Sequence, residues 1–269
     1  MTEAFKGQTF KGWTIAVTGA SSGMGRAIAR HLAAEGAFVA GCGRNLLELK
    51  ETERLIREAG GRFRPVQNDL AEPGAGQAFV REAAAAQGRL DAVICNAAVI
   101  DVDPIAKGDP ASWRRMIAIN LISVAETFQA AIEIMRPTGR PGWLVAISSL
   151  ASRMEGMGMY GASKAGLNSL CQSLRLELEK DQIRVSTVIP GAFATNLGRD
   201  MPPEVRDRFL EEMRAKGPHA APDETGRSAI MGLPEDIARA VAFVLAQPPS
   251  LNIPELVIRP QMDLTIPLE

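Results

Sequence analysis

Histidine, cysteine and tyrosine are scarce in this chain of 269 residues, which contains two, three and one of them, respectively. His31 and His219 lie far apart and show no ligand spacing, so the sequence disfavours a metal site built on histidine and cysteine. Cys42, Cys95 and Cys171 are odd in number and stand among small or apolar residues, which indicates reduced core thiols rather than disulfides. We therefore expect a cytoplasmic protein without a metal centre.

The chain also lacks a charge bias and long apolar runs. Its 30 basic and 31 acidic residues give a net charge of -1, and no basic stripe is present for a nucleic-acid backbone. No apolar run reaches the roughly 18 to 20 residues of a membrane-spanning helix, and the first residues, "MTEAFKGQTFKG", lack the apolar core of a signal peptide. With no linker, repeat or low-complexity tract, the sequence predicts a single domain over 1–269 that binds neither nucleic acid nor membranes.

Short apolar segments alternate with longer segments of helical period. Strands that are apolar almost throughout are typical of a parallel sheet covered on both faces. The alternation therefore predicts a doubly wound, Rossmann-like α/β fold with a seven-stranded parallel sheet and helices on both faces. The strands are expected at 13–19, 37–43, 62–67, 91–97, 142–149, 183–191 and 255–260. The helices are expected at 23–36, 46–60, 74–88, 112–137, 160–181 and 234–247.

Residues 192–232 interrupt this alternation. They are rich in charges, prolines and glycines, with one short helical piece at 202–216. The segment follows the carboxyl end of a strand, where ligands of such sheets bind, so it predicts a substrate lid. A solvated loop is the equally weighted alternative.

The first strand leads directly into "TGASSGMGRAIA" at 18–29, which places Gly19, Gly23 and Gly25 where the chain turns from strand to helix. The missing side chains let a pyrophosphate approach the backbone, and the helix start presents free N–H groups and the positive end of its dipole. A tight turn that binds nothing is the structural alternative.

The only tyrosine, Tyr160, is followed four positions later by Lys164. In a helix the two side chains share one face. A nearby ammonium would lower the pKa of the phenol and make it an effective proton shuttle near neutral pH. Packing without chemistry is the alternative.

The glycine pattern resembles that of the short-chain dehydrogenase/reductase family, and further motifs extend the similarity over nearly the whole chain. "ICNAA" at 94–98 resembles the family's Asn-Ala-Gly element, with alanine in place of the usual glycine, and "IAINL" at 117–121 resembles the motif of its catalytic asparagine. "AISS" at 146–149 and "YGASK" at 160–164 match the motifs of its catalytic serine and of its catalytic tyrosine and lysine. "IPGAFAT" at 189–195 matches the Pro-Gly turn at the nicotinamide end of the cofactor.

The resemblance assigns catalytic roles to Asn120, Ser149, Tyr160 and Lys164. It implies that Tyr160 exchanges the proton, that Ser149 binds the substrate oxygen, and that Asn120 anchors a water linked to Lys164, which also holds the nicotinamide ribose. The choice of serine is open, because Ser149 occupies the family's place but stands 11 residues before Tyr160, whereas Ser148, at 12, suits the spacing better. Adjacent strand residues face opposite sides, so only one can point into the site, and we favour Ser149.

The resemblance also implies how the cofactor is chosen. In "GCGRN", Gly43 stands where NAD-preferring relatives have an acid, and Arg44, which can pair with a 2′-phosphate, follows. This favours NADP(H) over NAD(H); an exposed helix-capping arginine and an NAD(H)-preferring enzyme are the alternatives. Asp69 matches the family's adenine contact, with a helix N-cap as its alternative. Cofactor contacts are expected at Gly19, Ser21, Ser22, Gly23, Met24, Gly25, Arg44, Asp69, Leu70, Asn96, Tyr160, Lys164, Pro190, Gly191, Phe193 and Thr195.

These motifs predict an NADP(H)-dependent carbonyl reductase or alcohol dehydrogenase, in which the cofactor supplies the hydride and the protein supplies orientation and proton transfer. A nucleotide-sensing interaction protein without catalysis is the alternative, because fold alone does not determine function. Family members commonly pair through two long helices, here those containing Asn120 and Tyr160, so we expect a homodimer or homotetramer. The sequence does not specify which carbonyl or alcohol is the substrate.

Overall fold

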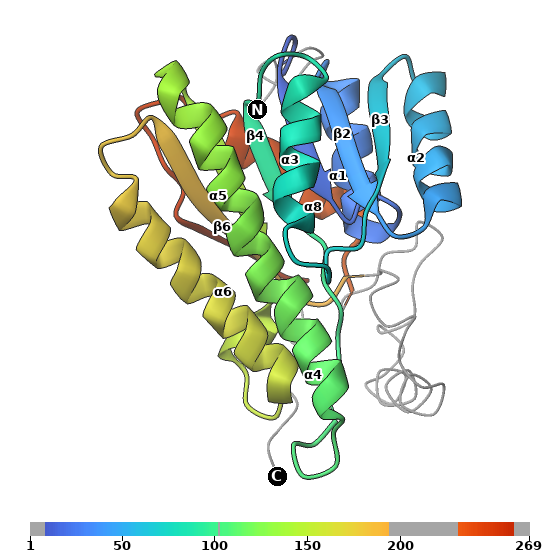
Figure 1. Ribbon diagram of the computed structural model, residues 1–269, viewed down its shortest axis with the longest axis vertical. Helices are drawn as coiled ribbons and strands as arrows, with labels where there is room; N and C mark the ends of the chain where they lie inside the picture. Colours follow the sequence, from blue (N-terminus) through green and yellow to red (C-terminus); the bar gives the residue numbers. More distant parts are fainter. Residues whose placement is uncertain (1–8, 102, 194–230, 261–269) are drawn as a thin grey trace.

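The computed structural model describes residues 9–101, 103–193 and 231–260. Seven parallel strands form one sheet in the order β3-β2-β1-β4-β5-β6-β7, with helices packed on both faces (Figure 1). The predicted doubly wound α/β fold is thereby confirmed. The strands are β1 (Thr14–Thr18), β2 (Phe38–Gly43), β3 (Arg62–Gln67), β4 (Ala92–Cys95), β5 (Gly142–Ile147), β6 (Ile183–Pro190) and β7 (Glu255–Ile258).

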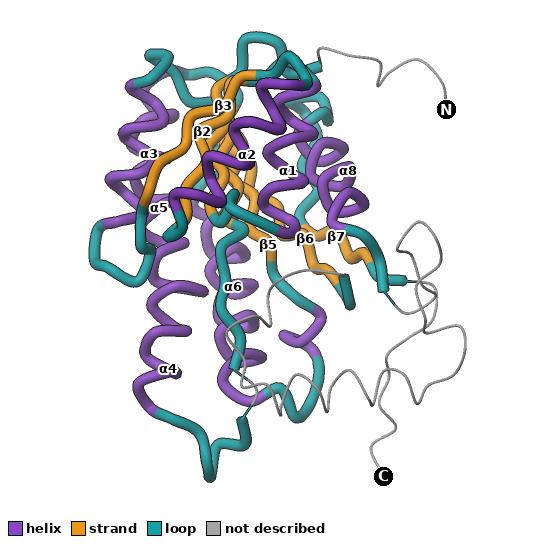
Figure 2. The backbone as a smooth tube through the Cα atoms, turned by 90° about the vertical axis from the view of Figure 1, so that its right-hand side faces the viewer, coloured by secondary structure: helices purple, strands orange, loops and turns teal. Residues whose placement is uncertain are grey.

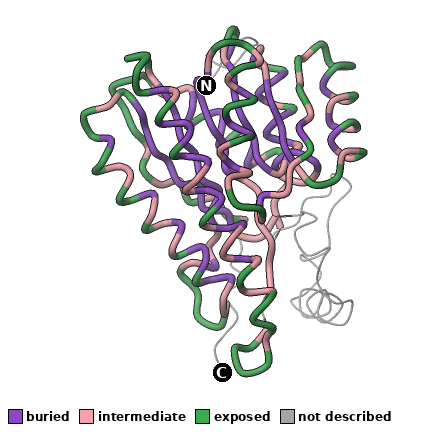
Figure 3. Tube along the Cα trace, in the orientation of Figure 1, coloured by how far each residue is buried: buried purple, intermediate pink, exposed green. Residues whose placement is uncertain are grey.

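Burial along the strands explains why their sequences are so apolar. Every residue of β1, β4, β5 and β6 is buried, whereas the edge strands β3 and β7 have exposed positions (Figure 3). Pro65 lies in the edge strand β3, where a residue without an N–H is tolerated. The central strands therefore form the rigid layer that fixes the positions of the loops at their carboxyl ends.

Two layers of helices cover this sheet, and each has its own apolar core (Figure 2). On one face α1 packs closely against α8, with α2 beside α1 and β3. On the other face α3 packs against α5, and α6 lies against β6. The helices are α1 (Gly23–Ala34), α2 (Leu46–Glu58), α3 (Ala75–Ala85), α4 (Pro110–Ile117), α5 (Ser123–Met135), α6 (Gly158–Glu177) and α8 (Pro234–Leu245).

The helix expected at 112–137 is a composite. A π-helical turn, η1 (Ala118–Ile122), joins α4 to α5, and a 3-10 turn, η2 (Arg136–Thr138), follows. By length and composition alone, Pro110–Thr138 is long and apolar enough to cross a membrane, and half of its most apolar window is buried in the protein. Single π turns of this kind are frequent at functional sites, and this one contains Asn120.

The two ends of the predicted 192–232 lid lie together. Phe193 and Gly232 form an isolated parallel bridge, and the Gly232 amide donates to the Ala192 carbonyl at 3.0 Å. The segment between them, 194–230, lies outside the described residues. The described residues on either side of it therefore lie together, close to the end of β6.

Candidate active site

The loop between β1 and α1 requires glycine at defined positions. Gly19 and Gly23 have φ angles of 68° and 53°, in the left-handed region that favours glycine. A Cβ on Gly25 would lie 2.1 Å from the Gly19 carbonyl oxygen and 2.5 Å from the Asn96 amide nitrogen. The first turn of α1 is thus pressed against the loop, and no larger residue fits at position 25.

The start of α1 offers hydrogen-bond donors that the protein itself leaves open. Its N-cap, Ser22, makes no side-chain capping bond, and the first turn has no acidic residue. By contrast, Asn45 and Asp109 cap α2 and α4 with their side chains. An uncapped helix start with a bare loop in front of it suits an anion such as a pyrophosphate.

Two side chains hold this loop in place. The Asn96 amide nitrogen donates to the Thr18 carbonyl at 3.0 Å, and the Thr18 hydroxyl accepts from the Asn96 backbone amide at 3.0 Å. From the other side, Arg26 donates to the Ser21 carbonyl and forms a 2.5 Å ion pair with Glu48 of α2. The loop is therefore fixed before any ligand binds.

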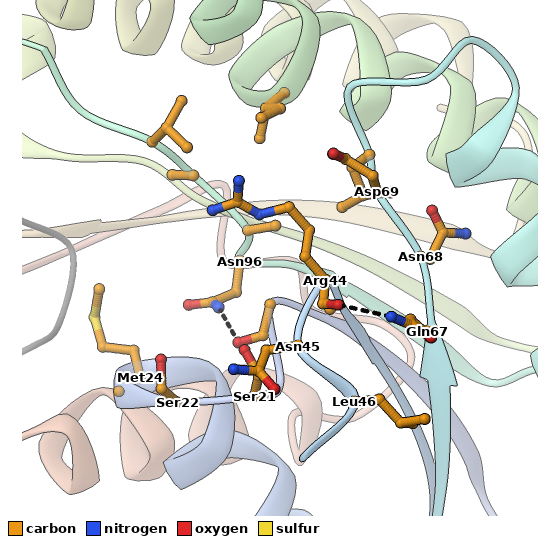
Figure 4. A pocket seen from close by; sticks show the side chains of 18 of the residues that line it. Ser21, Ser22, Met24, Arg44, Asn45, Leu46, Gln67, Asn68, Asp69 and Asn96 are labelled. Atoms are coloured by element: carbon orange, nitrogen blue, oxygen red, sulfur yellow. Dashed lines mark hydrogen bonds between the residues drawn. The ribbon is translucent and has the colours of Figure 1, made fainter. Parts of the chain in front are cut away.

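A cleft of about 720 Å³ lies in front of the loop (Figure 4). Nine of the predicted cofactor residues line it: Gly19, Ser21, Ser22, Gly23, Met24, Arg44, Asp69, Leu70 and Asn96. Gly25 lies behind this wall and serves close packing. The cleft also contains residues that were not among the expected cofactor contacts, although Gly43, Ala97 and Ala98 lie in the motifs quoted above: Gly43, Asn45, Leu46, Leu47, Gln67, Asn68, Ala97, Ala98, Val99 and Ile119.

Arg44 and Asp69 lie on neighbouring strand ends at one end of the cleft. The Arg44 side chain extends into the pocket, while its carbonyl accepts from the Gln67 side chain at 3.1 Å (Figure 4). A Cβ on Gly43 would meet the Ser21 hydroxyl oxygen at 3.1 Å. Burial alone would raise the pKa of Asp69, but the Ala71 amide, Arg115 and Arg44 outweigh it and lower that pKa. The Asp69 carboxylate also accepts from the Ala71 amide, like an N-cap, at 3.0 Å.

The predicted catalytic residues lie beyond the other end of the cleft. Tyr160 is buried on α6 against Met116 and Ala151, and the Ser149 hydroxyl is close enough to offset part of the effect of burial on the pKa of the phenol. Ser149 follows β5 and accepts from the Ala151 amide at 3.2 Å. The hydroxyl of Ser148 is buried and has no hydrogen-bond partner in the part of the chain that the structure describes. Of the two serines, Ser149 is therefore the one that lies near Tyr160.

Lys164 lies on α6 together with Tyr160, and burial rather than the charge of Lys164 controls the pKa of the phenol. Its ammonium is buried and donates to the Ile147 carbonyl at 2.9 Å. Burial lowers the pKa of Lys164 to about 8, although Cys95 and Cys171 oppose this shift. Burial likewise raises the pKa of Tyr160, and the interaction with the Ser149 hydroxyl offsets this rise only in part. The expected lowering of the Tyr160 pKa by Lys164 is thus wrong here, because desolvation of the phenol dominates.

Asn120 connects the two sides of the site. Its side chain accepts from the Val99 amide and donates to the Val99 carbonyl, both at 2.9 Å. It also donates to the Ser163 hydroxyl at 3.1 Å, and that hydroxyl donates to the Tyr160 carbonyl at 2.7 Å. The role of Ser163, which lies inside the "YGASK" motif, becomes visible only in the fold. Asn120 fixes the strand-end loop to the helix that contains Tyr160.

The remaining predicted contacts are at the end of β6. Pro190 is the last residue of the strand, and the Gly191 amide donates to the Ile258 carbonyl at 2.7 Å. Phe193 packs against the core on the α1 and α8 side, and Thr195 lies outside the described residues. Within 9–101, 103–193 and 231–260, no group of three or more histidine, cysteine, aspartate or glutamate side chains is placed to hold a metal ion.

The geometry fits a dinucleotide. The uncapped start of α1, the bare glycine loop and the adjacent Arg44 suit phosphates. Val99 lines the cleft and also packs against the cluster that contains Tyr160, so the cleft ends near the predicted catalytic residues. A phenol with a serine hydroxyl nearby and an amine on the same helix can exchange a proton with a substrate oxygen. No side chain in this arrangement accepts a hydride, so that chemistry belongs to a bound cofactor.

Known proteins share this arrangement. Residues 13–206 match the family model described as short chain dehydrogenase. A (3R)-3-hydroxyacyl-CoA dehydrogenase from Rattus norvegicus is 34% identical over 241 residues, 86% of this chain and 88% of the relative. A cis-4-hydroxycyclohexanecarboxylate dehydrogenase from Sinomonas cyclohexanicum is 34% identical over 250 residues, 92% of this chain and 94% of the relative. The crystal structure of a metagenomic short-chain oxidoreductase in complex with NADP aligns with a TM-score of 0.75 at 33% identity, covering 95% of this chain and 100% of that one.

Proposed function

Because the chain belongs to the short-chain dehydrogenase family, we propose that it is an NADP(H)-dependent oxidoreductase that interconverts a carbonyl compound and a secondary alcohol, with Tyr160 as the general acid and base. The observation that supports this most directly is the placement of Tyr160 and Lys164, both buried, on one helix, with the Ser149 hydroxyl close enough to influence the pKa of the phenol. Residues 1–269 act as one domain in this proposal, and 192–232 act as its substrate lid.

The bound nicotinamide supplies the hydride. In the reductive direction, the phenol of Tyr160 gives its proton to the carbonyl oxygen as the carbon receives the hydride, and the resulting phenolate then takes a proton from solvent. The raised pKa of Tyr160 keeps the phenol protonated at neutral pH, which suits this donor role. The Ser149 hydroxyl holds the substrate oxygen next to the phenol. Lys164 holds the nicotinamide ribose, and Asn120 keeps both sides of the site in register.

The cofactor preference rests on one end of the cleft. Arg44 offers a guanidinium to a 2′-phosphate, and Gly43 leaves no carboxylate to chelate ribose hydroxyls. The complex of the metagenomic oxidoreductase with NADP agrees with this preference. We expect Arg44→Ala to raise KM for NADPH at least tenfold while changing KM for NADH less than threefold, as loss of a charge-assisted bond to phosphate implies.

The surroundings of Tyr160 favour a substrate with an apolar body. Met116, Ala151 and Tyr160 form a cluster with half-buried Val99, Ile100, Met157 and Met159 packed against it. Methionines make such a surface adaptable. The two similar dehydrogenases are named for hydroxy compounds, which agrees with a secondary alcohol as substrate.

We also propose that the protein is a cytoplasmic homodimer or homotetramer. An open groove of about 550 Å³ follows α4 and the π turn and is lined by Trp113, Ile117, Ile122 and Met159 among others. Ile122 is 50% exposed there. A second copy of the chain would cover this apolar face. Light scattering coupled to gel filtration measures the mass, and a monomer at micromolar concentration contradicts the assembly.

Turnover tests the proposal directly. NADPH oxidation is followed over a panel of apolar ketones for the wild-type protein and Tyr160→Phe. We expect the variant to lose at least a hundredfold in kcat because it has no exchangeable proton, while its affinity for NADPH stays within threefold. Equal turnover by the two proteins excludes Tyr160 as the acid. Binding of NADPH without turnover of any substrate by the wild type would instead favour a nucleotide-sensing role.

A further inference from the structure

Asp69 is not an isolated carboxylate at the edge of the cofactor cleft. Arg115, in the last turn of α4, donates from Nη2 to both Asp69 carboxylate oxygens, at 3.1 and 3.4 Å. The two residues are 46 positions apart in the sequence, so no local pattern reveals the pair. Among the described residues, Asp69 is the one side-chain partner of Arg115.

The pair is half exposed and lies beside the position proposed for the 2′-phosphate. The side chains of Arg115 and Asp69 are 40% and 36% exposed. Such an ion pair adds little to stability, because water screens both partners. Arg44, on the neighbouring strand end, is close enough to lower the pKa of Asp69 together with Arg115. A phosphate bound to Arg44 would therefore be exposed to the negative charge of Asp69.

A dianionic 2′-phosphate next to an uncompensated carboxylate is repelled, and NAD, which has no such phosphate, is not. Arg115 does not line the cleft itself and cannot replace Arg44 as a direct ligand. Its guanidinium instead stands behind the carboxylate and supplies the opposite charge. The sequence motifs identify one arginine, Arg44, for the phosphate. The fold adds a second cation, Arg115, on the far side of Asp69.

We infer that Arg115 is a specificity-determining residue that favours NADP(H) over NAD(H) by neutralising Asp69 beside the phosphate bound to Arg44. This inference rests on the proposed function, since it concerns the cofactor of that site. Arg115 acts through Asp69 and is a positioning residue with an electrostatic effect, and no contact between Arg115 and the cofactor is required.

The test is a double-mutant cycle in which cofactor binding is measured directly. Kd for NADP+ and NAD+ is measured by titration calorimetry for the wild type, Arg115→Ala, Asp69→Asn and the double variant. We expect Arg115→Ala to weaken NADP+ binding about fivefold relative to NAD+, the order of magnitude for a divalent phosphate and one charge separated by roughly 8 Å in water. Asp69→Asn shifts the ratio the other way. The double variant, with the same net charge at the pair as the wild type, returns the ratio to within about twofold of the wild-type value.

Salt and a neighbouring arginine separate this effect from a structural one. Raising NaCl from about 0.05 to 0.5 M shortens the Debye length from about 14 to 4 Å, so the effect of Arg115→Ala on the ratio fades. Arg114→Ala removes an exposed charge from the adjacent position and serves as the matched control, with the ratio unchanged.

Two outcomes overturn the inference: an equal loss of affinity for both cofactors in Arg115→Ala, or a double variant that keeps the altered ratio. Failure of the proposed function has a different signature, since the wild-type protein would then bind neither NADP+ nor NAD+, or would bind both without dependence on Arg44.

Discussion

Because the ammonium of Lys164 is buried, we expect the free energy of unfolding of this protein to change with pH in the alkaline range. The side chain is 2% exposed, and its described hydrogen bond is the one to the Ile147 carbonyl at 2.9 Å. Burial lowers the pKa of Lys164 from 10.5 to about 8. At about 1.4 kcal/mol for each pH unit, this difference corresponds to a free-energy penalty of about 3 kcal/mol for the charged folded state.

The direction of this pH dependence follows from the number of protons that the folded and the unfolded protein bind. Below pH 8 the lysine is protonated in both states, and the whole penalty is present. Between about pH 8 and 10.5 the folded protein has released the proton while the unfolded chain still holds it, so the free energy of unfolding rises with pH. Above 10.5 the penalty is gone. Lys164→Met removes this titration, and it also leaves the Ile147 carbonyl without its partner, at a cost of about 1 to 3 kcal/mol at every pH.

The assay is urea unfolding of the wild type and Lys164→Met at pH 7 to 10.5 and constant ionic strength. Other titrating groups cancel in the difference between the two proteins. We expect the free energy of unfolding of the wild type, relative to that of the variant, to increase by about 3 kcal/mol over this range. Lys180→Met, at an exposed position, controls for the removal of a lysine charge. A difference that stays constant with pH to within about 1 kcal/mol refutes the buried, desolvated ammonium.

Three further predictions concern the site. Ser149→Ala lowers kcat about a hundredfold or more, because it removes the hydroxyl that we propose holds the substrate oxygen beside Tyr160, whereas Ser148→Ala stays within about threefold; steady-state kinetics that reverse this order would exchange the two serines. Gly25→Ala abolishes dinucleotide binding in calorimetry, since its Cβ would lie 2.1 Å from the Gly19 carbonyl oxygen, and wild-type affinity would contradict this packing. Because burial raises the pKa of Tyr160, the rate of ketone reduction is flat across neutral pH while alcohol oxidation rises towards alkaline pH; a falling oxidation rate would argue against Tyr160 as the base.

Much of the fold was predictable because strand burial leaves a direct trace in the sequence. Segments such as 91–97 and 142–149 are apolar on both faces, which only a covered parallel strand requires, and both became central strands. The boundaries of the long helix at 112–137 were less accurate. Its π turn depends on packing against α6 and on the Asn120 side chain, neither of which has a periodic signal.

The candidate site also contains residues that the sequence could place and residues that only the tertiary fold reveals. Motif residues near a strand end, such as Ser149 and Arg44, could be placed at one edge of the sheet from the sequence, because the carboxyl ends of parallel strands share that edge. Residues that act through distant partners were missed, since the pairing of Arg115 with Asp69 or of Arg26 with Glu48 depends on the tertiary fold. The direction of the Tyr160 pKa was wrong because depth of burial outweighed the nearby ammonium, and depth cannot be counted from spacing.

Gly25, behind the cleft wall, and Gly43, in the cleft, differ in how much change they tolerate. At position 25 a Cβ would lie 2.1 Å from the Gly19 carbonyl oxygen, so only glycine fits there. At Gly43 a Cβ meets side chains alone, the Ser21 hydroxyl oxygen at 3.1 Å and the Ser21 Cβ at 3.2 Å, so a shift of a few tenths of an ångström would accommodate it. A carboxylate introduced at position 43 would be adjacent to the Arg44 guanidinium. The same turn would then offer an acid to the ribose hydroxyls, while the glycine loop in front of α1 would keep its backbone.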